Sequence, residues 1–476
     1  MTIRSAFVCI TWMLSAAICQ AADTPSRPNI VLIFADDLGW RDVALSNDGF
    51  IETPNLDRLR AQGMSFTAAY AGAANCAPSR ACLLSGLYTP RHGVYAVGDT
   101  DRGPKEKFRL TPIPNSPGLR PGIVTMAEAL KGLGYATGHF GKWHLGSEGR
   151  GTGPKQQGFD TSPAELVPAQ DGGGEDEEPA PEKGKRSPPE DPKRASTVTK
   201  AACEFIESSK DRPFFAYLAH HAIHTPLQAK PATLARFRAK AEATKVPHVA
   251  ALYAACIYEL DESVGVLLEK LDELGLERNT LVIFTSDNGG TPASINEPLR
   301  GAKGAYYEAG IREPFFARWP GKIRPGSRCD VPIINQDLYP TFVAAAGGQV
   351  VPDLDGANIL PLFEGKQSRD RAAIFWHFPG YLDRPVPRGR DPLFRTRPVS
   401  VIRKGDWKLF LYHEEWLLDG GRGALATNHA VELYNIREDL GEREDLAQKD
   451  PSRRDELLDE LLVWIGRTNA PLAKRK

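Results

Sequence analysis

The chain of 476 residues lacks an excess of charge of either sign, since 59 lysines and arginines oppose 60 aspartates and glutamates. A formal charge of -1 gives no overall attraction to nucleic acid or to an acidic membrane surface. We therefore expect neither as a partner, although a local cationic pocket is compatible with this balance. Hydrophobic residues make up 41% of the chain and charged residues 25%, proportions typical of a globular protein.

Beyond residue 22 the sequence also lacks any apolar run long enough to cross a bilayer. Residues 1–22 carry Arg4, then an apolar stretch over residues 7–19, then small residues at Ala21 and Ala22. This order is typical of a secretory signal peptide and is too short for a stable anchor. We expect an exported protein, periplasmic or secreted, without a stable membrane anchor.

Cysteine is scarce, and two of the seven cysteines, Cys9 and Cys19, lie in the predicted signal peptide. An oxidising compartment permits disulfides among the others, but their wide spacing specifies no connectivity and matches no zinc-binding pattern. We therefore predict no disulfide framework. The cysteines whose pairing the sequence does not specify are Cys82, Cys203, Cys256 and Cys329.

The length of the chain exceeds what one hydrophobic core usually supports, which predicts a large domain and a smaller one. Apolar runs typical of buried strands alternate with helical patterns in the large domain, which we place at residues 27–365. This alternation predicts an α/β fold whose sheet is covered by helices on both faces. The strand runs are 29–34, 135–144, 213–219 and 280–285, and the helical patterns include 123–133 and 249–274.

A second pattern begins near residue 366, where strand-like runs follow one another without long helices. We expect residues 366–476 to form a small antiparallel sheet with a packed helix. The predicted strands are 372–378, 399–412 and 431–436, and the predicted helix is 452–465.

One segment inside the large domain departs from the alternation. Residues 161–195 combine several prolines, three consecutive glycines, an acidic run and then mixed charges. Such a composition buries too little apolar surface to offset its ordering entropy. We predict a flexible surface insertion there.

Oxygen-rich residues follow two of the predicted strands. Asp36 and Asp37 end the first, and Asp287 and Asn288 end a later one. Each pair alone is more simply a turn or a helix cap. Because ligands bind at the carboxyl ends of strands in open α/β sheets, the two pairs together predict one ion site. Hard oxygen ligands favour Ca²⁺, with Mg²⁺ less favoured and zinc disfavoured.

Between these pairs lies the motif C-x-P-x-R at residues 76–80. Pro78 suits the first turn of a helix that we predict to run through residues 81–87, with Cys76 just ahead of its first turn. The positive end of the helix then favours negative charge at residue 76. By composition alone, Arg80 is an ordinary solvated helix charge and Cys76 a small buried side chain.

Basic and titratable groups follow two further strands. In G-K-W-H at residues 141–144, a strand period of two places Lys142 and His144 on one face and Trp143 on the other. A fixed ammonium group beside an imidazole suits an anionic substrate that requires proton transfer. The simpler alternative is a strand-end lysine and a buried histidine.

Three histidines follow the strand at residues 213–219, namely His220, His221 and His224. No cysteine or Glu-x-x-His pattern accompanies them, so a zinc cluster is weakly supported.

Together these segments resemble the type I, formylglycine-dependent sulfatases, an arylsulfatase-like family of the alkaline phosphatase superfamily. The family motifs C-x-P-x-R and G-K-W-H match in full, and His224 and Lys303 stand in the matching segments H-T-P-L and L-R-G-A-K-G. Only Ala77 departs from the common pattern, in which serine or threonine is frequent. Further matching landmarks are GIREPFFARWPG (310–321), DLYPT (337–341), DGAN (355–358) and ELYNIREDLGEREDL (432–446).

The resemblance implies an alkaline phosphatase-like fold: α/β, with a large, mostly parallel mixed sheet sandwiched by helices and a small C-terminal antiparallel sheet with a packed helix. It also implies that a formylglycine-generating enzyme oxidises Cys76 to formylglycine, whose hydrate is the nucleophile. The implied calcium ligands are Asp36, Asp37, residue 76, Asp287 and Asn288.

The same resemblance implies a role for each remaining polar residue. Arg80 would hold the formylglycine hydrate, and Lys142 and Lys303 would neutralise sulfate oxygens. His224, helped by Lys303, would protonate the departing alcohol, and His144 would accept a proton from the hydrate. His220 and His221 are expected to be packing or rim residues.

The expected function is hydrolysis of a sulfate monoester, on a small molecule or an oligosaccharide, by an exported sulfuric ester hydrolase. Two alternatives stay open: a phosphonate or phosphate ester hydrolase of the same superfamily, or a non-catalytic glycan-binding relative if Cys76 is not oxidised. The substrate rim is expected in variable loops, at residues 97–121 and 376–397.

Overall fold

The computed structural model describes residues 27–43, 49–166, 188–245, 248–350, 353–366 and 372–476. The predicted signal peptide and residues 167–187 of the predicted insertion lie outside this part of the chain. Among the described residues, no helix is both long and apolar enough to traverse a bilayer.

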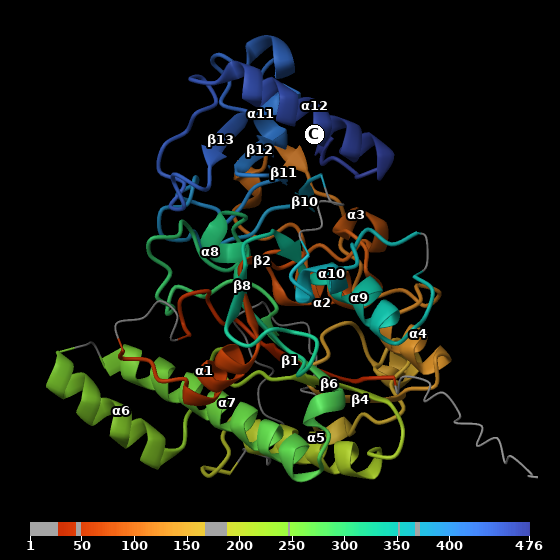
Figure 1. Cartoon of the computed structure of the whole chain (residues 1–476). Coiled ribbons are helices and arrows are strands. Elements are labelled where there is room, and N and C mark those ends of the chain that lie inside the picture. Colours follow the sequence, from red (N-terminus) through yellow and green to blue (C-terminus); the bar gives the residue numbers. More distant parts are fainter. Residues whose placement is uncertain (1–26, 44–48, 167–187, 246–247, 351–352, 367–371) are drawn as a thin grey trace, which may run out of the picture.

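A mixed sheet of eight strands forms the centre of the described chain, and its main path runs β4-β5-β1-β6-β7-β2-β8, with β9 paired to β2 (Figure 1). Strands β4, β5, β1 and β6 are parallel, whereas β7 is antiparallel to both of its neighbours. The strands are β1 (Asn29–Ala35), β2 (Met64–Tyr70), β4 (Ala136–Gly141), β5 (Phe214–Ala219), β6 (Thr280–Ser286), β7 (Arg312–Arg318), β8 (Ser327–Cys329) and β9 (Ile333–Ile334).

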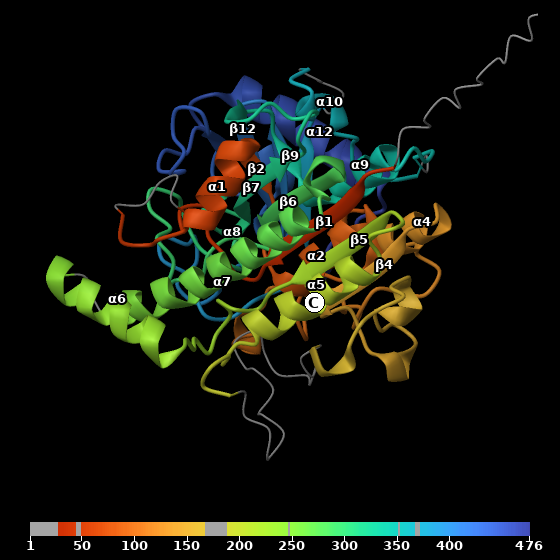
Figure 2. The same ribbon diagram turned by 60° about the horizontal axis from the view of Figure 1, so that its bottom comes forward.

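Helices cover both faces of this sheet, as its uniformly apolar central strands require. In β1, Val31 and Ile33 pack into the core on one face, whereas Leu32 and Phe34 pack into the core on the other. Figures 1 and 2 show the two helical layers. The first contains α1 (Pro54–Gln62), α5 (Ala195–Ser208), α6 (Pro231–Thr244) and α7 (His248–Glu273), and the second contains α2 (Cys76–Ser85), α4 (Met126–Gly132), α9 (Leu338–Ala345) and α10 (Leu360–Phe363).

A separate antiparallel sheet of four strands, in the order β10-β11-β12-β13, lies at the top of Figure 1. Trp464 of its long helix α12 stacks on Phe375 of β10 with ring centroids 4.8 Å apart. A two-stranded ladder joins β3 (Leu110–Thr111) to β14 (Lys474–Arg475). The remaining elements are α3 (Thr89–His92), α8 (Glu308–Ile311), β10 (Ile374–Phe378), β11 (Val399–Lys404), β12 (Trp407–Tyr412), α11 (His413–Leu418), β13 (Val431–Asn435) and α12 (Pro451–Arg467).

The fold class predicted from the sequence is confirmed, and three predicted elements are corrected. The single strand predicted at 399–412 is a hairpin of β11 and β12, because Gly405 turns the chain with a φ of 57°. Helix α2 begins at Cys76 itself, ahead of the predicted start. Strand β4 ends at Gly141, so the period of two does not extend to His144, whose φ is 63°.

The boundary between a catalytic domain at 27–365 and a subdomain at 366–476 stays a prediction. Both described ends of the predicted insertion are packed: Leu166 is buried, and Asp191 accepts hydrogen bonds from the first-turn amides of Ser196 and Thr197 in α5. The flexibility predicted for the rest of the insertion remains a prediction.

Candidate functional site

The predicted site residues meet at one end of the large sheet. Strands β1 and β6 are parallel neighbours, with Ala35 paired to Ser286, so the residues that follow them emerge side by side. Asp36 and Asp37 leave β1, and Asp287 and Asn288 leave β6. Helix α2 starts beside them, because Cys76 is its first residue.

The acidic groups surround the thiol of residue 76. Cys76 Sγ lies 3.3 Å from Asp36 Oδ1 and 3.7 Å from Asp37 Oδ1. One ligand atom from each of Asp36, Asp37, Cys76 and Asp287 lies within 4.8 Å of the others. All four side chains are buried, so these donors form a compact group shielded from solvent.

Asn288 completes this group. Its Nδ2 donates to Asp37 Oδ1 at 2.8 Å, while its buried Oδ1 has no hydrogen-bond partner among the described residues. A buried carbonyl oxygen without a donor is costly unless it meets water or a cation. The set of hard oxygens therefore fits a divalent cation, and its ligands would be the five predicted residues.

Three cations neutralise the acids from different elements. Arg80, in the first turns of α2, donates from Nη2 to Asp287 Oδ2 at 2.8 Å and from Nη1 to the carbonyl of Lys142 at 3.0 Å. Lys142 Nζ lies 2.7 Å from Asp36 Oδ2, and Lys303 Nζ lies 2.9 Å from Asp37 Oδ2. Each predicted cation is thus within hydrogen-bonding distance of a predicted metal ligand.

The guanidinium of Arg80 also lies 5.3 Å from the ring centroid of Phe34 in β1. This contact was not predicted, since Phe34 reads in the sequence as one more apolar residue of a buried strand. An aromatic face under a buried cation restricts its rotamer and adds to the attraction.

Of the predicted histidines, His224 lies close to the acids, with Nε2 3.8 Å from Asp37 Oδ2. Its Nδ1 lies 2.7 Å from the carbonyl of Thr225, which assigns the proton to Nδ1 in the neutral ring. His144 is half-buried beside Lys142, and its buried Nδ1 has no partner among the described residues. His220 is buried against Thr199, in agreement with a packing role, and His221 is half-buried.

The acids differ in their affinity for protons. Burial opposes ionisation of Asp36, but Lys142, His224 and Arg80 hold its pKa well below the ordinary value. The pKa of Asp37 is also lowered, because Lys303 and His224 outweigh its burial. Burial and the charge of Asp36 instead raise the pKa of Asp287 to about 7, against the opposing effect of Arg80.

The thiol and the imidazoles are shifted toward their neutral forms. Burial, followed by the charges of Asp287 and Asp36, raises the pKa of Cys76 well above its ordinary value. Burial and Lys142 lower the pKa of His224 to about 4. The same two causes lower the pKa of His144 well below its ordinary value.

Comparison with known proteins identifies the family of this chain. A sulfatase family model matches residues 28–348, and a model of the C-terminal region of N-sulphoglucosamine sulphohydrolase matches residues 302–461. A sulfatase of Formosa agariphila is 33% identical over 94% of this chain and 90% of its own length. Human arylsulfatase A is 33% identical over 88% of this chain and 83% of its own.

Among solved structures, Ps i-CgsB in complex with k-i-k-neocarrahexaose is 28% identical over 95% of both chains, with a TM-score of 0.72. The shared architecture is the alkaline phosphatase-like fold that the sequence predicted. Members of the sulfatase family generally use a formylglycine and a divalent metal ion. With a family model over most of its length and relatives at this level of identity, the chain belongs to the sulfatase family and is a sulfuric ester hydrolase.

Proposed function

We propose that this chain is an exported sulfatase that uses formylglycine at residue 76 and one calcium ion to release sulfate from a sulfated carbohydrate. The observation that carries the proposal is the convergence of three carboxylates on Cys76, with the Asn288 amide bonded to Asp37 and an ammonium group on each of Asp36 and Asp37. When bound, the metal ion and a hydrated aldehyde at residue 76 would supply charge neutralisation and a nucleophile.

The lysines make the site suitable for an anion. A sulfate monoester is a stable anion that repels nucleophiles, so its charge must be neutralised before sulfur is attacked. Lys142 and Lys303 bracket the acids, and both ammonium groups are positioned to contact sulfate oxygens beside residue 76. Arg80 is held by Asp287, so it orients groups at residue 76 without moving.

The imidazoles supply proton transfer. With a pKa of about 4, His224 is neutral at pH 7 in the absence of substrate. A bound sulfate ester adds negative charge, which raises this pKa and favours the imidazolium that protonates the departing alcohol. His144 lies on the Lys142 side of the site, and its Nδ1 meets no hydrogen-bond partner within the described part of the chain. We assign to it the proton released at residue 76.

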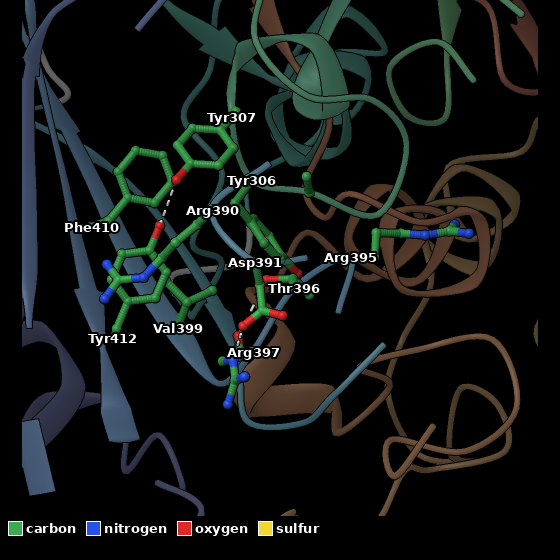
Figure 3. A pocket seen from close by; sticks show the side chains of 11 residues that line it. Tyr306, Tyr307, Arg390, Asp391, Arg395, Thr396, Arg397, Val399, Phe410 and Tyr412 are labelled. Carbon is green, nitrogen blue, oxygen red and sulfur yellow. Dashed lines mark hydrogen bonds and ion pairs between the residues drawn. The ribbon is translucent and has the colours of Figure 1, made fainter. Parts of the chain in front are cut away.

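The contacts between the two predicted rim segments, residues 97–121 and 376–397, support a carbohydrate pocket. Both predicted rim segments meet: the amide of Tyr381 donates to the carbonyl of Thr100 at 2.7 Å, and the amide of Ile113 donates to the carbonyl of Pro379 at 3.1 Å. A pocket beside these segments is lined by residues that include Tyr307, Arg390 and Tyr412, and Figure 3 shows Arg395 turned away from its other side chains. The aliphatic part of the Arg395 side chain packs against Gly304, since a Cβ added at Gly304 would lie 2.0 Å from Arg395 Cδ.

Gly304 directly follows Lys303, so these loops stand beside the proposed sulfate site and are suited to bind the rest of the substrate. The neocarrahexaose complex of the relative named above supports a sulfated saccharide as the substrate class.

The function is tested by comparing hydrolysis of an aryl sulfate with that of the matching aryl phosphate, followed by a panel of sulfated mono- and oligosaccharides. We expect kcat/KM to favour the sulfate strongly, with loss of activity on chelation and recovery with Ca²⁺ ahead of Mg²⁺. A preference for phosphate would support the phosphoester alternative. Saccharide binding without turnover, by a chain with an unmodified thiol, would support the glycan-binding alternative.

Export is part of the proposal and has its own test. The layout of residues 1–22 supports cleavage after the small residues at its end. N-terminal sequencing of protein recovered from the periplasm or medium should begin shortly after Ala22. Recovery of the full-length chain from the cytoplasm would contradict export.

A further inference from the structure

The turn that follows Asp36 and Asp37 contains another fully buried acid, Asp42, which has no role in the chemistry described above. Its Oδ2 accepts hydrogen bonds from the amide of Gly39 at 2.8 Å and from the hydroxyl of Tyr253 at 2.6 Å. Its Oδ1 accepts from the amide of Ile295 at 3.1 Å. Because these donors are neutral, their number and direction stabilise the buried carboxylate.

The three donors come from three separate segments. Gly39 belongs to the turn after β1, Tyr253 to helix α7, and Ile295 to the loop after β6. The Tyr253 hydroxyl also lies 2.7 Å from Oγ of Ser294, which extends the connection along that loop. Asp42 therefore joins segments that are more than 200 residues apart in the sequence.

The loop after β6 carries functional residues at both ends, with Asn288 at its start and Lys303 at its close. The carbonyl of Gly290 accepts a hydrogen bond from the backbone amide of Lys303 at 2.8 Å. Gly39 packs on the same glycine, since an added Cβ at Gly39 would lie 3.3 Å from Gly290 Cα. Arg41 donates to the carbonyl of Glu297, a second connection between the turn and the loop.

We propose that Asp42 is a positioning residue that holds the turn carrying Asp36 and Asp37 against the loop carrying Asn288 and Lys303, with Tyr253 as its anchor on α7. The acids, cations and imidazoles around residue 76 must be held within a fraction of an ångström to act together. A single buried carboxylate that accepts from both segments couples their positions. Its effect on catalysis depends on the proposed function, whereas the coupling itself is a property of the chain.

Another buried acid, on the helix α7 that carries Tyr253, offers a matched control because its contacts are only structural. Asp261 of α7 is also buried and accepts from neutral donors, the amides of Asn55 at 3.0 Å and Leu56 at 2.8 Å. These amides belong to the first turn of α1 (Pro54–Gln62), away from the loops of the site. Asp261→Asn should therefore cost a comparable amount of stability without affecting the site.

The experiment is hydrogen–deuterium exchange by mass spectrometry on the full chain with a chelator present, comparing Asp42→Asn, Tyr253→Phe and Asp261→Asn with the unchanged chain. In Asp42→Asn, the side-chain NH₂ group faces one of the donors from which the carboxylate accepted a hydrogen bond, so that hydrogen bond is lost. We expect exchange to accelerate roughly tenfold in peptides from both 36–43 and 288–303 for Asp42→Asn, and less for Tyr253→Phe, with α1 unchanged. Asp261→Asn should accelerate exchange in α1 only.

The proposal is overturned if Asp42→Asn accelerates hydrogen exchange in peptide 36–43 alone. It is also overturned if Asp261→Asn accelerates exchange in 36–43 and 288–303 as much as Asp42→Asn does. Tyr253→Phe removes one hydroxyl and keeps the ring, so it tests the same coupling if Asp42→Asn folds poorly. On the active enzyme, Asp42→Asn should weaken Ca²⁺ binding roughly tenfold and lower kcat more than it raises KM. If the unchanged chain neither binds Ca²⁺ nor releases sulfate, the proposed function fails, and the exchange result still decides the coupling.

Discussion

At residue 76, the surroundings of the thiol disfavour the thiolate as long as no cation is bound there. A thiol reacts as the thiolate, yet burial and the charges of Asp287 and Asp36 raise the pKa of Cys76 far above neutrality. The same neighbours suit a neutral group that becomes a metal ligand. The position is therefore chemically consistent with conversion of Cys76 to an aldehyde, as the family resemblance implies.

Replacing Cys76 with serine tests this requirement. Serine supplies one hydroxyl where the hydrated aldehyde supplies two, so the Cys76→Ser variant is expected to bind substrate and to turn over at most once per site. Product formed in the first seconds, measured against the concentration of sites, gives the stoichiometry. Sustained turnover by a chain shown by mass to be unmodified serine would contradict the mechanism.

Replacing Lys142 with methionine tests the neutralisation of charge. The ammonium group lies 2.7 Å from Asp36 Oδ2 in a mostly buried position, so its loss removes a fixed positive charge next to the substrate. We expect kcat/KM for an aryl sulfate to fall by roughly 10² or more.

Lys131→Met is the control for that variant, because Lys131 is half-exposed and its ion pair with Asp160 lies on the surface. Its kcat/KM should stay within about twofold of the unchanged chain. A Lys142→Met enzyme that kept full activity would remove the residue from the proposed mechanism.

At this scale the motifs C-x-P-x-R and G-K-W-H and the acidic strand ends predicted which acids, cations and imidazoles would gather near residue 76, and the structure brings the acids and cations together there. Their roles stay predictions. The sequence did not identify Asp42 or Phe34. Asp42 reads as a turn residue, and its partner Tyr253 is 211 positions away on a helix. Only the fold reveals such a pair, since neither residue type nor local spacing distinguishes it.

At the scale of elements, the end of β4 determines where Lys142 lies. Gly141 has a φ of 105°, and a Cβ there would lie 2.2 Å from the carbonyl oxygen of Ala219 in β5. The amide of Lys142 donates to that same carbonyl at 2.8 Å. Glycine therefore lets the chain leave the sheet and direct Lys142 toward Asp36.

The substitution Gly141→Ala should separate the ends of β4 and β5 and displace Lys142. We expect a loss of about 2 kcal/mol or more in unfolding free energy, with a fall in kcat/KM, measured by urea denaturation and aryl sulfate hydrolysis. Gly149→Ala is the control, because no atom lies within 4 Å of an added Cβ and the φ is not in the left-handed region. Equal unfolding free energies of the two variants would show that the chain accommodates a side chain at Gly141 despite the close approach to Ala219.

Strand and helix positions were predictable because buried parallel strands read as continuous apolar runs. Their ends were less so. The helix at Cys76 begins earlier than Pro78 suggested, the run at 399–412 hides the turn at Gly405, and the left-handed backbone of His144 interrupts the expected strand. In each case one residue's backbone conformation, invisible to a hydrophobic pattern, determined the boundary.

At the scale of the whole molecule, a buried ionic cluster joins the two sheets. Glu308 belongs to α8, which directly precedes β7 of the large sheet, and the Glu308 carboxylate accepts from Lys408 of β12 at 2.9 Å and from Arg312 of β7 at 2.7 Å. The Tyr70 hydroxyl of β2 donates to it at 2.8 Å. The sequence did not predict this junction, because each of these charges reads alone as a surface residue.

This cluster predicts a pH dependence of stability. Burial opposes ionisation of Glu308, but Lys408 and Arg312 lower its pKa from 4.5 to about 2. A lowered folded-state pKa stabilises the fold above the unfolded-state value, and this stabilisation is lost as pH falls from 4.5 toward 2. Glu308→Gln should lose about 3 kcal/mol at pH 7, and its deficit should shrink below pH 4.5.

Urea denaturation of both proteins between pH 3 and pH 7 measures this difference, with Glu456→Gln, an exposed member of surface ion pairs, as the control. The control should show almost no deficit at any pH. A deficit of Glu308→Gln that stays constant with pH would indicate that the cluster contributes packing and not charge.

The central claim, that an oxidised residue 76 within this ring of acids and lysines releases sulfate, is tested most directly by one correlation. The protein is prepared with varying amounts of formylglycine-generating enzyme, and the rate of sulfate release is measured for each preparation. Each preparation is then digested, and mass spectrometry of the peptide containing residue 76 gives the fraction that carries the aldehyde. We expect the rate to rise in proportion to the aldehyde and to extrapolate to zero without it. Full turnover in a preparation whose residue 76 is entirely an alkylatable thiol would contradict the account.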